Sequence, residues 1–109
     1  MITRQNHGRC TWIGLFRLSG PPENVHLQGC LGAYVTVLAV AGDETEFERR
    51  VADAADAIGL AVEEAVWREP LAQRLERYHI EDYLVTMARE ASETGEVRFG
   101  VFDVWEAEE

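Results

Sequence analysis

The segment Ala33–Val40 (AYVTVLAV) is a nearly continuous apolar run, and a sharply bounded amphipathic helix follows it almost at once. A short apolar run of this kind predicts a strand buried on both faces. Asp43 and Glu46 have the spacing of a capping box, and Gly59 stands where a left-handed helix cap is usual. We therefore predict a helix over Glu44–Ile58. A buried strand joined to an amphipathic helix restricts the chain to folds in which helices pack on a sheet.

The rest of the chain supplies three more strands and a second helical region. Dense or alternating apolar residues predict strands over Cys10–Leu18, Leu60–Arg68 and Val97–Trp105. Both faces of Cys10–Leu18 are largely apolar, which favours a central strand or one covered on both sides. Between the last two strands the helical phase breaks near His79, which predicts two helical pieces with a bend there.

The predicted order is β, β, α, β, α, β, and the predicted fold class is α+β, a four-stranded sheet with two main helices packed on one face. We expect Leu60–Arg68 to return beside Ala33–Val40 and close a βαβ unit. In architecture this arrangement resembles a ferredoxin-like sandwich, although the usual order there is β, α, β, β, α, β. The resemblance covers roughly Tyr34 onward and rests on no motif, so it implies nothing about function.

Length and composition favour one domain with its own core. The chain has 109 residues, of which 47% are hydrophobic. We expect a loose arm over residues 1–9, a single domain over 10–105 and a charged tail over 106–109. No apolar run approaches the roughly 18 residues of a membrane span, and the first residues do not resemble a signal peptide. The expected location is therefore the cytoplasm.

The chain is strongly acidic, with 20 acidic residues against 10 basic ones and a formal net charge of −10. This charge repels phosphate backbones and anionic lipid surfaces, so we expect no binding to nucleic acid or membranes. The same field attracts a cationic partner, although acidity also serves solubility alone. Four acidic side chains of the predicted helix are the expected contacts for a basic partner protein: Glu44, Glu48, Asp53 and Asp56.

In size and charge alone, the chain resembles small inhibitors and immunity proteins, which occupy the cationic clefts of basic toxins or nucleases. That resemblance implies a protein-binding module of bacterial type, and we expect no cofactor. Trp12, Trp67 and Trp105 are expected in the core, and any exposed one is a natural anchor for a partner. Glu63 and Glu64 interrupt a predicted strand and fit best as edge residues that repel intruding strands. Self-association through such an edge or a tryptophan face stays open.

His79 supports an alternative function, because it stands close to Glu81 and Asp82 at the predicted bend. A histidine beside carboxylates can act as an acid or a base. The alternative is a small enzyme or ligand-binding domain that uses His79 and the long 19–32 loop. The competing interpretation is structural, since acidic residues are favoured in the first turn of a helix. The alternative function requires a pocket that holds His79 beside a carboxylate, and a flat surface there would contradict it.

A further alternative is a zinc-stabilised domain. Two residues separate His7 from Cys10, and three separate His26 from Cys30. Two imidazoles and two thiolates suit tetrahedral zinc. Against this, a hydrophobic strand lies between the two pairs, and the competing interpretation is two reduced cysteines and two surface histidines. Cys10 begins the first strand and Cys30 precedes the second. If these two strands pair antiparallel, the cysteines lie at opposite ends of the pair, too far apart for a disulfide.

Overall fold

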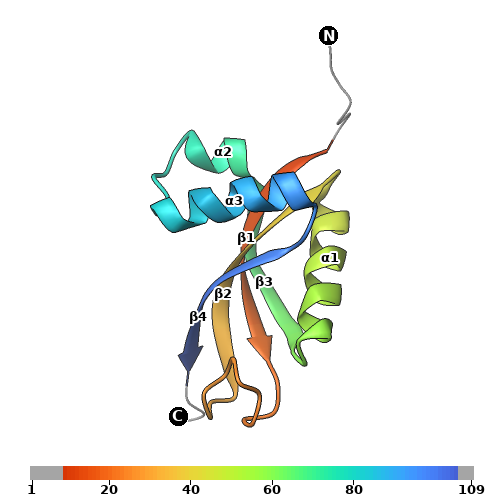
Figure 1. The fold of residues 1–109 in the computed structure, drawn as a ribbon, viewed down its shortest axis with the longest axis vertical. Coiled ribbons are helices and arrows are strands. Elements are labelled where there is room, and N and C mark those ends of the chain that lie inside the picture. Colours follow the sequence, from red (N-terminus) through yellow and green to blue (C-terminus); the bar gives the residue numbers. More distant parts are fainter. Residues whose placement is uncertain (1–8, 106–109) are drawn as a thin grey trace.

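The computed structural model describes residues 9–105 of the chain. Its centre is an antiparallel hairpin of two long strands, β1 (Cys10–Ser19) and β2 (Gly32–Ala41). β3 (Ala61–Pro70) pairs with the free edge of β1, and β4 (Arg98–Trp105) pairs with the free edge of β2. The sheet therefore has the order β3-β1-β2-β4, with every neighbouring pair antiparallel (Figure 1).

The described residues also form three helices. α1 (Glu44–Ala57) connects β2 to β3, while α2 (Leu71–Leu75) and α3 (Asp82–Thr94) connect β3 to β4. The predicted bend near His79 is the break between α2 and α3, and α3 ends at Gly95, whose φ of 78° gives a left-handed cap. None of the helices in residues 9–105 is long and apolar enough to cross a membrane. The α+β class and the predicted order of elements are confirmed.

Two separate cores lie on the two faces of the sheet. The larger core lies beneath α1 and includes these buried residues: Phe16, Leu18, Val35, Val37, Phe47, Val51 and Ala55. The smaller core lies beneath α3 and consists of these buried residues: Ile13, Leu38, Leu84 and Ala88. Because side chains alternate along a strand, successive positions of β1 and β2 face different helices.

The helices therefore cover opposite faces of the sheet, which corrects the expectation that they pack together on one face in a two-layer, ferredoxin-like arrangement. α1 lies on one side, and α2 and α3 lie on the other (Figure 1). The physical reason is the composition of β1, since a central strand with two apolar faces needs cover on both. That signal was present in the sequence of Cys10–Leu18.

A second correction concerns β3, which lies beside β1 and not beside β2 as expected. β1 is antiparallel to both, so β2 and β3 run parallel with β1 between them. The β1–β2 hairpin has two free edges, and the alternation of side chains along β3 does not encode which of these edges β3 joins. α1 carries the chain across to the β1 edge. Glu63 and Glu64 are exposed on this edge strand, as predicted.

The crossover between the two edge strands covers only one end of the second face. Pro70 at the end of β3 pairs with Trp12, and Arg98 at the start of β4 pairs with Leu38. Both positions lie at the end of the sheet away from the β1–β2 loop. Because α2 and α3 cross there, none of the helices in residues 9–105 lies over the other end of this face (Figure 1).

The long β1–β2 loop closes the opposite end of the larger core. Leu27 is fully buried in that core. The Asn24 side-chain amide donates to the carbonyl oxygen of Ile58, at the end of α1, over 2.8 Å. The loop therefore has a packing role that accounts for much of its length.

Candidate functional site

The uncovered half of the second sheet face is the first candidate site, and we call it the open sheet face. The strand register places two rows of residues across it. The row nearer the helices is Glu64, Arg17, Tyr34 and Asp103, and the row nearer the loop includes Ser19, Gly32 and Trp105. The face thus brings together side chains from all four strands.

An aromatic and arginine stack forms the centre of the open sheet face. The indole of Trp105 lies directly on Gly32, where an added Cβ would stand 2.0 Å from the nearest ring atom. The Tyr34 and Trp105 ring centroids are 5.5 Å apart, and the Arg17 guanidinium carbon is 4.9 Å from the Trp105 centroid. The contact between the two rings and the contact between the guanidinium and the indole are both favourable, and together they hold the rings in place. Tyr34 is nevertheless 38% exposed.

The three tryptophans differ in their surroundings. Trp12 packs at the margin of the larger core, and Trp67 packs at the margin of the smaller core. Trp105 packs against neither, although core placement was expected for all three. Aromatic residues and arginine are the types enriched at energetically important positions of protein interfaces. Trp105 is therefore the tryptophan whose position fits an anchor.

Carboxylates border the open sheet face on both edge strands. Glu63 and Glu64 on β3 and Asp103 on β4 are exposed. Within residues 9–105, none of the three forms an ion pair. The Ser19 hydroxyl donates a hydrogen bond to the Glu63 carboxylate. These three carboxylates outnumber the Arg17 guanidinium of the stack, so the open sheet face carries net negative charge.

The four acidic residues predicted as partner contacts fall into two pairs on α1. Glu44 and Glu48 both form ion pairs with Arg68 of β3, so one guanidinium partly neutralises them. Asp53 and Asp56 are exposed and have no ion pair in the described part of the chain. Since α1 covers the other face, none of the four borders the open sheet face. The charged tail predicted over residues 106–109 lies outside the described residues.

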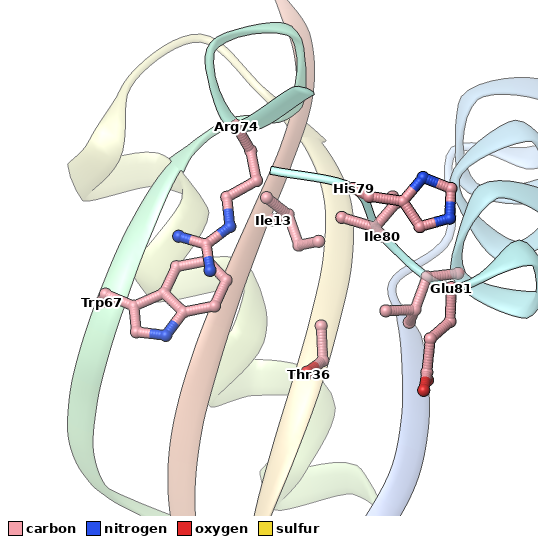
Figure 2. Close-up of a pocket in the computed structure, with 8 residues that line it drawn as sticks. Ile13, Thr36, Trp67, Arg74, His79, Ile80 and Glu81 are labelled. Atoms are coloured by element: carbon pink, nitrogen blue, oxygen red, sulfur yellow. The ribbon is translucent and has the colours of Figure 1, made fainter. Parts of the chain in front are cut away.

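A pocket of about 210 Å³ lies where the α2–α3 segment meets the sheet (Figure 2). Its floor is formed by Ile13, Thr36 and Trp67 of three adjacent strands. Its opposite wall is formed by Ile80, just before α3, and by Leu84 within that helix. The smaller core ends here, so the pocket is apolar at its base.

The polar lining of the pocket consists of Arg74, His79 and Glu81. The Arg74 guanidinium carbon lies 3.7 Å from the Trp67 ring centroid, and its Nη1 donates to Glu69 over 2.9 Å. The imidazole of His79 points away from Trp67 and the strands (Figure 2). A pocket with a histidine and a carboxylate therefore exists, but the orientation of the imidazole does not place its nitrogens over the pocket floor.

His79 and the 19–32 loop, which were predicted to share a site, lie at opposite ends of the sheet. The pocket is lined by Ile13 and Thr36, whereas the loop joins Ser19 to Gly32 at the far end of the hairpin. The topology separates them because α2 and α3 cross at the other end. No single site uses both.

The candidate zinc ligands are also separated. Cys10 begins β1, while His26 and Cys30 lie in the loop at the other end of a strand about 30 Å long. His7 lies outside the described residues. Within residues 9–105 no group of three or more histidine, cysteine or acidic side chains could hold a metal ion. Both cysteines are free, as expected, and the His26 ring stacks on Phe102 with centroids 4.9 Å apart.

Sequence reasoning identified Trp105 as a possible anchor but missed Arg17, Tyr34 and Gly32, which come to it only through strand pairing. No protein-family model, no curated protein sequence and no solved structure matches the chain. The fold and its surface alone therefore define the class: an α+β domain with one partly uncovered sheet face that carries stacked aromatic residues between acidic margins.

Proposed function

We propose that the protein is a binding module that engages a partner protein with a basic surface, and that the open sheet face is where the partner docks. The observation that carries this proposal is the partly exposed stack of Tyr34, Trp105 and Arg17, on a part of the sheet over which residues 9–105 place no helix. Tryptophan, tyrosine and arginine supply most of the large energetic contributions in protein interfaces. The stack is held by its own contacts, so little side-chain freedom is lost on binding.

Charge supports a basic partner. Glu63, Glu64 and Asp103 border the stack without ion pairs in residues 9–105, and the whole chain carries a net charge of −10. Such a field increases the rate at which a cationic protein arrives and orients it. Asp53 and Asp56 on α1 face away from the open sheet face, so under this proposal they act only through the long-range field.

The test compares two variants that remove the same number of charges. The open-face variant carries Tyr34→Ala, Glu64→Gln and Asp103→Asn, and the α1 variant carries Asp53→Asn and Asp56→Asn. Each is immobilised and used to capture partners from the native cell at low salt. We expect the open-face variant to lose proteins that the wild type retains, with affinity reduced by roughly tenfold or more, because truncating an aromatic anchor of an interface costs about 2 kcal/mol or more, and about 1.4 kcal/mol corresponds to tenfold.

Two outcomes contradict the proposal. If the α1 variant loses the partner and the open-face variant keeps it, the contact surface is the acidic helix. If the wild type alone forms a dimer that Tyr34→Ala dissociates, as measured by sedimentation, the open sheet face is a self-association surface. In either case the proposed role of the open sheet face is wrong.

The pocket favours a second candidate function, the binding of a small ligand. It holds both His79 and Glu81, as that alternative requires, and it is lined mainly by apolar groups. Its volume of about 210 Å³ is below the roughly 300 Å³ at which pockets for drug-sized ligands begin. A ligand held by this pocket alone is therefore smaller than a drug-sized molecule.

A further inference from the structure

We propose that the pocket between α3 and the sheet receives one aromatic or branched apolar side chain of the partner, and that a basic residue beside that side chain pairs with Glu81. This inference rests on the proposed function, since it assigns the anchor through which a basic partner is held. It concerns a different set of residues, so the two can fail separately.

The pocket is continuous with the open sheet face. Thr36 and Trp67 of the pocket floor are both register partners of Leu15 on the central strand β1. Two residues further along the same face of β1 comes Arg17, which belongs to the aromatic stack. A partner seated on the open sheet face therefore lies against the mouth of the pocket.

The size of the pocket selects one side chain. An apolar cavity of about 150 Å³ is sufficient to hold a benzene ring, and this pocket measures about 210 Å³. Ile13, Ile80 and Leu84 provide apolar contacts, and burial of a large apolar side chain contributes substantially to binding. Interface anchors characteristically fill pockets of this kind near the centre of a contact surface.

The pocket is preorganised on the side of Trp67. The Arg74 guanidinium is stacked between two rings, with its carbon 3.7 Å from the Trp67 centroid and 4.1 Å from the Tyr78 centroid. Glu69, whose side chain is only 12% exposed, pairs with Arg74 at 2.9 Å. Glu69 also pairs with Arg77, which is exposed, so the wall beside Trp67 keeps one net positive charge. The attraction for a basic neighbour therefore comes from the other side of the mouth.

The charge at the mouth specifies a basic neighbour for the anchor. Glu81 is exposed, makes no ion pair within residues 9–105, and its side chain makes no capping hydrogen bond to α3. Asp82, the next residue, is also exposed and without an ion pair in the same range. A lysine or arginine next to the anchor side chain meets these two carboxylates, whereas an acidic residue is repelled.

The test uses the full chain, isotopically labelled, and three N-acetyl dipeptide amides as probes: Arg-Phe, Arg-Ala and Glu-Phe. Nuclear magnetic resonance follows the Trp67 indole N–H and the Thr36 amide. We expect Arg-Phe to shift both signals saturably. Arg-Ala, without the ring, should bind roughly tenfold more weakly or not at all. Glu-Phe should bind about two- to fivefold more weakly at low salt, since an exposed charge pair contributes modestly.

Three variants assign the effect. Thr36→Leu fills the pocket floor and should abolish the shifts caused by Arg-Phe. Glu81→Gln should weaken Arg-Phe about two- to fivefold and leave the fold unchanged, because its side chain caps nothing. Glu93→Gln is the matched control, because Glu93 is an exposed residue of α3 that does not line the pocket. This variant should bind Arg-Phe as the wild type does.

The pocket proposal is overturned if Arg-Ala binds as well as Arg-Phe, if Glu81→Gln and Glu93→Gln behave alike, or if the shifted signals lie away from Trp67 and Thr36. If the dipeptides fail in this way while the open-face variant still loses the cellular partner, only the anchor assignment is wrong. If capture by the open-face variant matches the wild type, the proposed function is wrong whatever the dipeptides do.

Discussion

Gly32 determines the shape of the open sheet face at the level of a single residue. Its backbone is extended, so an alanine fits the strand without strain, yet a Cβ would lie 2.0 Å from the Trp105 ring. We expect Gly32→Ala to displace the indole into solvent while the sheet is retained. The Trp105 indole N–H signal should shift, and the free energy of unfolding should fall by about 1–3 kcal/mol, as in other cases of overpacking.

Ser19→Ala is the control for this prediction, because Ser19 pairs with Gly32 in the hairpin register and already carries a Cβ. An unchanged Trp105 signal in Gly32→Ala would show that the ring does not rest on the glycine. The role of Gly32 could not be predicted from sequence, because the ring above it comes from β4, far along the chain. Trp105 itself was recognisable as a candidate anchor, since it is aromatic and ends an apolar strand.

At the level of elements, local patterns determined the boundaries of helices and strands. α1 was predicted over Glu44–Ile58 and spans Glu44–Ala57, because a cap, an apolar stripe and a terminal glycine are all local signals. The pairing of β3 and the face covered by α3 were not predicted correctly, because both depend on which sheet edge is free after the first hairpin forms. Glu44 and Glu48 were recognised as acidic, but their pairing with Arg68 of β3 again required the sheet topology.

The start of α1 gives a pH-dependent prediction. The Glu46 amide donates to Asp43 over 2.8 Å, and the Glu46 carboxylate accepts from the Gly42 amide over 2.7 Å. The hydrogen bond from Gly42, followed by that from Arg9, lowers the pKa of Glu46 below its ordinary value of 4.5. A lowered folded-state pKa stabilises the protein above the unfolded-state value, and this contribution is lost as pH falls through the folded-state pKa.

We therefore expect Glu46→Gln to lower the melting temperature at pH 7, and we expect this difference from wild type to shrink as the pH falls below about 4.5. Thermal unfolding of both proteins between pH 7 and pH 3 measures it. Arg9→Ala should reduce the pH-dependent difference without removing it, because the hydrogen bond from Gly42 is the larger cause. A difference that stays constant across this range contradicts the assignment.

At the level of the whole molecule, two cores of unequal size imply unequal local stability. Phe47, Val51 and Ala55 of α1 are fully buried in the larger core. In α3, Leu84 and Ala88 are 8% and 6% exposed and make up half of the four buried residues of the smaller core. The third buried residue of α3 is the small Ala91, and α2 buries none. Segments with few buried contacts open at lower free energy than the rest of a domain. The α2–α3 segment should therefore open while α1 and the sheet stay folded.

Native-state hydrogen exchange measures this difference. We expect the amides of α3 to exchange at a lower free energy of opening than those of Val51 and Ala55 in α1. Leu84→Ala, which removes buried side-chain volume, should cost about 2–5 kcal/mol and lower protection mainly in α3. Phe47→Ala, at about 3–5 kcal/mol, should lower protection throughout the sheet and α1. Equal exchange in both helices, with equal responses to both substitutions, would mean one cooperative unit. If the α2–α3 segment does open alone, it uncovers Trp67 and Thr36. The pocket is then complete only while this least stable part of the fold is closed.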